Sequence, residues 1–252
     1  MTAFSLKQLR LLAGLLLFCT AQTACDNEND PVTFYSTLGT VEESDGRTII
    51  VSDSYGTLLP ENVDYLTAKD ADSIGQRVLV GVQFPGEIPP ENTTKETEVQ
   101  IVELYKVLTK AADDLRGKPE DADTFGHDPI KIVSHSIENG HLTIEFIVWG
   151  YDESIRHRIS LVQTDEENSA NNGYISLELR HDSNGDLSRV PLSGIVSFPL
   201  KSIGGFESTE CKGLAISYND AGIQQTTIRI DKENNGSKRI TTTDNSHKEM
   251  YF

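Results

Sequence analysis

The chain has 252 residues, with 22 lysines and arginines against 39 aspartates and glutamates, so its formal net charge at pH 7 is −17. This acidity argues against a nucleic-acid partner, because phosphates attract basic side chains. It also argues against electrostatic attachment to an anionic membrane surface. The length suits one or two domains of ordinary size.

Residues 1–24 predict a secretion signal. Lys7 and Arg10 precede a short apolar run at 11–18, and small residues follow before Cys25. The run is too short to cross a bilayer, which takes about 20 apolar residues. The segment therefore predicts export rather than a membrane span.

Cys25 directly follows two small residues and resembles the lipid-attachment cysteine of a bacterial lipobox, although Gln22 stands where leucine is usual. We predict that Cys25 is acylated as the mature N-terminus, with 25–32 as an acidic tether. This predicts a lipid-anchored protein of the outer membrane that faces the cell surface. The alternative is an ordinary signal peptide cut near Ala21 or Ala24, which would release a free secreted protein.

Cysteine usage predicts a fold without an internal disulfide. The chain has three cysteines. Cys19 leaves with the signal and Cys25 carries lipid, so Cys211 has no partner in the mature chain.

Residues 33–112 predict a first β-rich domain. Five short runs of β-branched and aromatic residues would suit a small closed barrel. In 98–115 the apolar positions also fit helical spacing. We favour a strand to Leu108 with a slip in alternation near Val102, followed by a short helical turn. The five predicted strands are 34–42, 47–52, 56–60, 77–84 and 98–108.

Residues 113–128 are acidic and contain glycine and proline, which predicts a linker. The segment 129–231 then predicts seven strands packed as an antiparallel sandwich. Its clearest element is a hairpin of 131–137 and 142–149 around the turn Asn139–Gly140. The polar tail 232–252 predicts little fixed structure.

Several sequence blocks, in the same order, resemble landmarks of NigD-like proteins. The resemblance implies an all-β fold, with an N-terminal OB-like five-stranded barrel followed by a C-terminal antiparallel β-sandwich, on a Bacteroides-type lipoprotein. The family is associated with bacteriocin genes and an immunity role, and it brings no catalytic residues. The blocks are 103–110 (ELYKVLTK), 126–132 (GHDPIKI), 142–146 (LTIEF), 157–161 (HRISL), 173–181 (GYISLELRH) and 194–198 (GIVSF).

Two histidines are the strongest candidates for chemistry. His157 and His181 alternate with apolar residues on their predicted strands, so both point to the apolar side, and pairing of the strands would bring the imidazoles together. One interpretation is a metal or proton site. We favour the other, in which both border the core and bond to backbone or water, because no acidic or cysteine ligand has a suitable spacing.

Other polar patterns are better explained by structure than by chemistry. Arg156, Arg158, Glu178 and Arg180 predict a cross-strand ladder on an exposed sheet face. The segment 182–186 carries two aspartates but lacks the glycine and glutamate of a calcium loop, and it predicts a turn.

Trp149 and Tyr151 could stack on a sugar ring, but a single tryptophan in the chain favours packing. We therefore predict a non-enzymatic, lipid-anchored binding protein of the cell envelope, with immunity as one candidate role. A carbohydrate-binding lipoprotein and a hydrolase are the alternatives. No catalytic residue, cofactor or metal is expected, and the partner is an unidentified protein or glycan.

Overall fold

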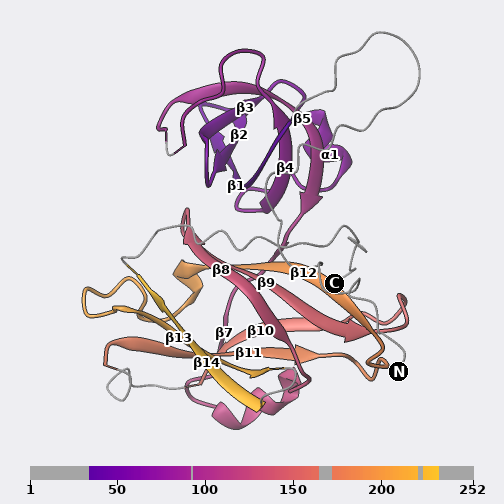
Figure 1. The fold of residues 1–252 in the computed structure, drawn as a ribbon. Helices are drawn as coiled ribbons and strands as arrows, with labels where there is room; N and C mark the ends of the chain where they lie inside the picture. The colour runs from indigo at the N-terminus through magenta and orange to yellow at the C-terminus, as the bar shows by residue number, and fades with distance from the viewer. Residues whose placement is uncertain (1–33, 92, 165–171, 221–223, 233–252) are drawn as a thin grey trace, which may run out of the picture.

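The computed structural model describes residues 34–91, 93–164, 172–220 and 224–232. It contains two β-structured units in succession along the chain, a barrel and a two-sheet sandwich (Figure 1). Cys25, the signal, the tether and most of the predicted tail lie outside the described residues. No helix in the described part is long and apolar enough to cross a membrane.

The first unit is a closed five-stranded barrel with the strand order β1-β2-β3-β5-β4. β3 and β5 pair in parallel, whereas the other barrel pairs are antiparallel. A short helix, α1, connects β3 to β4 and buries Leu66; the sequence did not predict it. The elements are β1 (Tyr35–Ser44), β2 (Arg47–Ser52), β3 (Gly56–Pro60), α1 (Asp64–Ala68), β4 (Arg77–Gln83) and β5 (Glu96–Lys106).

Alternating apolar side chains fill the barrel. Val78, Val80 and Val82 of β4 are fully buried, as period-2 geometry requires for one face of a strand. In β5 the register shifts, because Gly81 pairs with Glu103 while Val82 pairs with Ile101. Val102 is thus the extra residue of a β-bulge, and the predicted slip in alternation is confirmed.

The second unit consists of two sheets, with strand orders β14-β13-β11-β10-β7 and β6-β12-β9-β8. The predicted fold class is confirmed: the chain is all-β, with an OB-like barrel followed by a sandwich. Four of the seven strand pairs in the described part of the sandwich are antiparallel. β11 and β13 run parallel, as do the short strands β7 and β6 with β10 and β12. The strands are β6 (Leu108–Thr109), β7 (Asp113–Asp114), β8 (Lys131–Glu138), β9 (His141–Gly150), β10 (Arg158–Gln163), β11 (Tyr174–Asp182), β12 (Val190–Pro199), β13 (Gly213–Asp220) and β14 (Gln224–Asp231).

The sandwich core lies between the two sheets. Four alternating side chains of β9, from Leu142 to Val148, are at most 1% exposed. The turn before β9 has positive φ at Asn139 and Gly140, which is the backbone that a two-residue hairpin loop requires. The predicted hairpin therefore forms. Cys211 is a buried free cysteine within this core.

The segment 113–128 is not a free linker, and here the prediction is wrong. Its first residues form β7, which pairs with β10, and a 3-10 helix, η1 (Pro119–Phe125), packs against β10 and β11. The chain passes from barrel to sandwich at Val107, between β5 and β6. Backbone pairing and packing absorb a segment whose composition suggested a connection.

Polar contacts join the barrel and the sandwich close to the point where the chain passes from one to the other. Arg77, which is fully buried, donates to the Asp53 carboxylate through both terminal nitrogens, with a distance of 2.8 Å from Nη1 to Oδ1. Asn139, in the β8–β9 turn, donates to the same Oδ1 at 2.8 Å. Burial, and then the negative charge of Asp53, raise the pKa of Glu138. The β8–β9 turn therefore faces the barrel.

Candidate functional site

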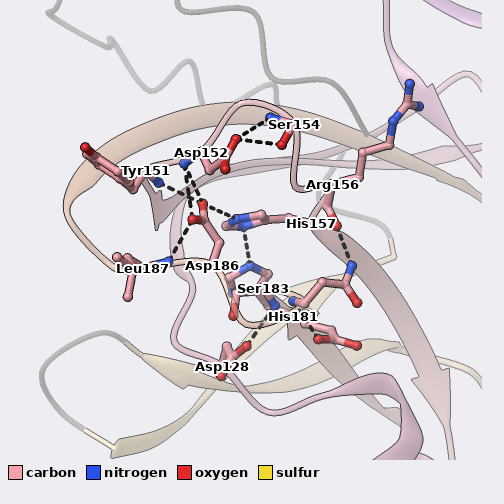
Figure 2. Close-up of polar contacts among 12 residues, drawn as sticks. Asp128, Tyr151, Asp152, Ser154, Arg156, His157, His181, Ser183, Asp186 and Leu187 are labelled. Carbon is pink, nitrogen blue, oxygen red and sulfur yellow. Dashed lines mark hydrogen bonds and ion pairs between the residues drawn. The ribbon is translucent and has the colours of Figure 1, made fainter.

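The predicted histidines meet at the end of the sandwich that lies away from the barrel. β9 starts beside the barrel-facing turn and ends nine residues later at Gly150, which at a strand rise of about 3.4 Å per residue carries the chain about 30 Å away. Three segments converge there: the β9–β10 loop, the β11–β12 loop and the residues before β8 (Figure 2). The antiparallel pairing of β10 with β11 sets Ile159 opposite His181 and so brings His157 close to it.

The two imidazoles are hydrogen-bonded to each other. His157 Nδ1 lies 2.9 Å from His181 Nε2, and the ring centroids are 5.0 Å apart. His181 Nδ1 lies 3.0 Å from the carbonyl oxygen of Pro129. At the other end, His157 Nε2 lies 3.2 Å from Asp186 Oδ2. We name this series, Asp186–His157–His181–Pro129, the histidine chain.

Counting protons shows that one ring of the histidine chain is protonated. Both ends are acceptors, a carboxylate and a carbonyl, so three hydrogen bonds need three N–H groups. Two neutral imidazoles supply only two, because each carries a single N–H. One of the two rings therefore carries an extra proton, and the count alone allows either ring. Burial lowers the pKa of His181, so we place the proton on His157, beside the Asp186 carboxylate; His181 then donates to Pro129 through Nδ1 and accepts at Nε2.

Asp186 is the anchor of this arrangement. Its side chain is 2% exposed, and besides His157 it accepts from the backbone N–H groups of Tyr151 and Leu187, each at 2.7 Å, and of Asp152 at 3.1 Å. Desolvation alone would raise the pKa of Asp186, but these donors, led by the Tyr151 N–H and the His157 side chain, lower it to about 2. The carboxylate is therefore ionised at neutral pH.

A missing side chain makes room for this carboxylate. A Cβ atom on Gly150 would lie 2.7 Å from Asp186 Oδ2 and 3.2 Å from His157 Nε2. Both distances are closer than ordinary van der Waals contact, so glycine is the residue that lets Asp186 reach the imidazole.

The electrostatics of the other end agree with a neutral His181. Burial lowers the pKa of His181, and the charge on His157 lowers it further, against the Pro129 carbonyl, which raises it. Burial raises the pKa of the neighbouring Asp128 carboxyl, but the Ser183 N–H, at 2.7 Å, and the histidines bring it below its usual range. The Asp128 charge thus also faces the pair.

This geometry favours a structural role for the histidines. All four ring nitrogens are committed to partners, and His181 bonds to backbone as predicted. No group of three or more histidine, cysteine or acidic side chains in the described ranges is placed to hold a metal. Asp186, which joins the pair, was not predicted as a partner. It lies 29 residues after His157, in a segment predicted only as a turn. Nothing in the sequence around Gly150 indicates that this glycine makes room for a carboxylate.

The outer face of the same sheet is less exposed than predicted. Arg180 pairs with Glu178 on its own strand, and its side chain is only 10% exposed. Arg158 bonds to Asp182 at 2.8 Å and stacks 5.3 Å from the centre of the Phe125 ring of η1. The predicted ladder of bare charges is therefore partly covered by η1.

Comparisons with known proteins agree with this architecture. Residues 114–232 match the family model of the NigD-like C-terminal β-sandwich domain. No curated protein matches the chain.

Solved structures similar to the chain show the same fold. One is a Bacteroides vulgatus protein of unknown function, with 18% identity and a TM-score of 0.64 over 84% of this chain and 96% of that one. A candidate toxin-related protein from Parabacteroides distasonis has 23% identity and a TM-score of 0.60 over 78% and 92% of the two chains. A NigD-like immunity protein from Bacteroides caccae has 20% identity and a TM-score of 0.56 over 81% and 95%. The domain match bears out the resemblance of the sequence blocks for residues 114–232, which are similar to the NigD-like C-terminal β-sandwich domain, and the solved structures show that the chain shares their fold.

Proposed function

We propose that the chain is a non-enzymatic, lipid-anchored binding protein of the cell envelope that acts as an immunity-type factor. The observation that carries the non-enzymatic part of the proposal is the closed histidine chain, since the ring nitrogens best suited to catalysis each serve a buried hydrogen bond. Likeness to a NigD-like immunity protein and to a toxin-related protein supports the role. An enzyme would need titratable groups that converge on a substrate.

The arrangement of the two units suits a protein held at a surface. Arg77, beside the sandwich, pairs across β1 and β4 with Thr40, whereas Tyr35 pairs with Val82 further from the sandwich. Phe34, the first described residue, therefore lies toward the barrel end away from the sandwich. A lipid on Cys25 would place the barrel next to the membrane and the sandwich beyond it.

A survival experiment tests this proposal. Bacterial cells that are killed by a bacteriocin would carry the full chain, the Cys25→Ser variant or an empty vector. They would then be exposed to culture supernatants that contain this bacteriocin. We expect the full chain to protect and the Cys25→Ser variant, made in equal amount, to protect less. Equal sensitivity of all three, or a turnover by the purified chain that His157→Ala abolishes, would contradict the proposal.

A further inference from the structure

Exposed apolar side chains gather at the end of the sandwich that holds the histidine chain. In the described part of the chain, three of the large apolar side chains that remain exposed are Tyr151 at 60%, Leu187 at 53% and Val190 at 42%. Tyr151 and Leu187 point away from the cluster on the same side (Figure 2). Val190, the first residue of β12, pairs with Gly150 at the end of β9 and so lies next to Tyr151. Exposed apolar residues that gather in this way mark interaction sites more often than scattered ones do.

The backbone beneath these side chains is held by hydrogen bonds to one buried carboxylate. One carboxylate, that of Asp186, accepts from the N–H groups of both Tyr151 and Leu187 at 2.7 Å. Its own position is set by the imidazolium of His157. The buried histidine chain therefore fixes the residues that carry the exposed side chains. A surface fixed before binding loses less conformational entropy when a partner docks.

A cation without an acidic partner lies at the same place. The Arg189 guanidinium carbon is 4.8 Å from the centre of the Tyr151 ring. Within the residues that the structure describes, no carboxylate lies within 4.0 Å of it. Such a guanidinium, in a chain of net charge −17, keeps its fork of N–H donors for a carboxylate from outside.

We propose that Tyr151, Leu187, Val190 and Arg189 form a preorganised docking surface for a protein segment that combines an apolar side chain with a carboxylate. The proposal rests on the binding function proposed above and names the surface and the chemistry of the partner. The apolar side chain packs on Tyr151 and Leu187, and the carboxylate meets Arg189. Stacking on a sugar is less suitable, because Arg189 already covers one face of the Tyr151 ring. The surface lies at the end of the molecule away from the barrel, where a protein can approach it from solution.

Selection from a phage-displayed library of random peptides tests the surface. The full folded chain would be the bait, and we expect the selected peptides to be rich in aspartate or glutamate next to leucine or an aromatic residue. Tyr151→Ala and Arg189→Glu should each weaken a selected peptide about 30-fold, the size of a typical hot-spot loss. The matched control is Ile74→Ser, because Ile74 is 71% exposed on the barrel, and it should change nothing.

A second selection tests whether the charge at position 189 determines the charge of the bound peptide. With Arg189→Glu as bait, the peptides should change from acidic to basic while they keep the apolar residue. Tight peptides that tolerate Tyr151→Ala and Arg189→Glu would overturn the docking surface and leave the general binding function standing. Selection of no peptide, with protection still seen in the survival experiment, would overturn the surface alone. Binding of a glycan that Tyr151→Ala abolishes, without any such peptide, would also overturn it.

Discussion

Replacing His157 with alanine should destabilise the sandwich strongly. His157 makes two of the three hydrogen bonds in the histidine chain, and its side chain is 2% exposed. The bond to the Asp186 carboxylate is charge-assisted, a class that contributes about 1.5–3 kcal/mol. The substitution also leaves Nε2 of His181 buried without a donor, at a cost of about 1–3 kcal/mol. Because water can enter the space, we expect a net loss of about 3 kcal/mol in the free energy of unfolding.

Urea unfolding followed by tryptophan fluorescence measures this loss of stability in the sandwich itself. The chain has one tryptophan, and Trp149 lies in β9 of the sandwich. Arg189→Ala is the control, since an exposed side chain at the same end should change stability by no more than about 0.5 kcal/mol. A His157→Ala variant within about 1 kcal/mol of the parent would refute the assigned hydrogen bonds.

Three further predictions concern pH, the junction between the units and the anchor. The pKa values of His181 and Asp186 are depressed in the folded state, so the unfolded chain takes up protons first as the pH falls. Stability measured by the same fluorescence should drop below pH 6.5 as His181 resists protonation, and drop again as the pH falls from 3.8 to about 2 through Asp186; a flat profile would contradict both assignments. Arg77→Met should cost about 3–5 kcal/mol, because it leaves the Asp53 carboxylate, 11% exposed, without its charged partner, and a thermal melt by circular dichroism equal to that of the parent would contradict this. Intact-mass analysis of the membrane fraction should show residues 1–24 removed and acyl mass on Cys25, whereas an unmodified soluble protein would argue for simple secretion.

The strands of both units could be predicted from the sequence because their burial is one-sided. Period-2 alternation and turn residues set most strand positions to within a few residues, and β8 with β9 followed directly from Asn139–Gly140. Even the bulge at Val102 left a trace, since an extra residue in a strand shifts the apolar positions to the other face. Local patterns carry this information because adjacent residues share one strand.

What the sequence could not predict depends on contacts between distant segments. The parallel pairing of β11 with β13 follows from the path of the chain, which alternation does not record. The acidic segment 113–128 has the composition of a linker, yet β7 pairs with β10, and Phe125 and Asp123 of η1 contact Arg158 and Arg180. Asp186 could not be assigned to His157, because a turn aspartate is common and only the folded loops bring the two together.

The histidine chain makes better physical sense as a device for positioning than as a source of net stability. A buried ion pair costs several kcal/mol to desolvate, and apolar replacement of a whole buried network is often neutral or stabilising. Removing one member is costly only because the others are left unsatisfied. The Asp186 carboxylate, however, binds the N–H groups of Tyr151, Asp152 and Leu187 at once, and no apolar side chain could fix three backbone positions in two loops. The feature that these bonds specify is thus the conformation of the loops that carry the exposed side chains, which joins the buried charges to the surface above them.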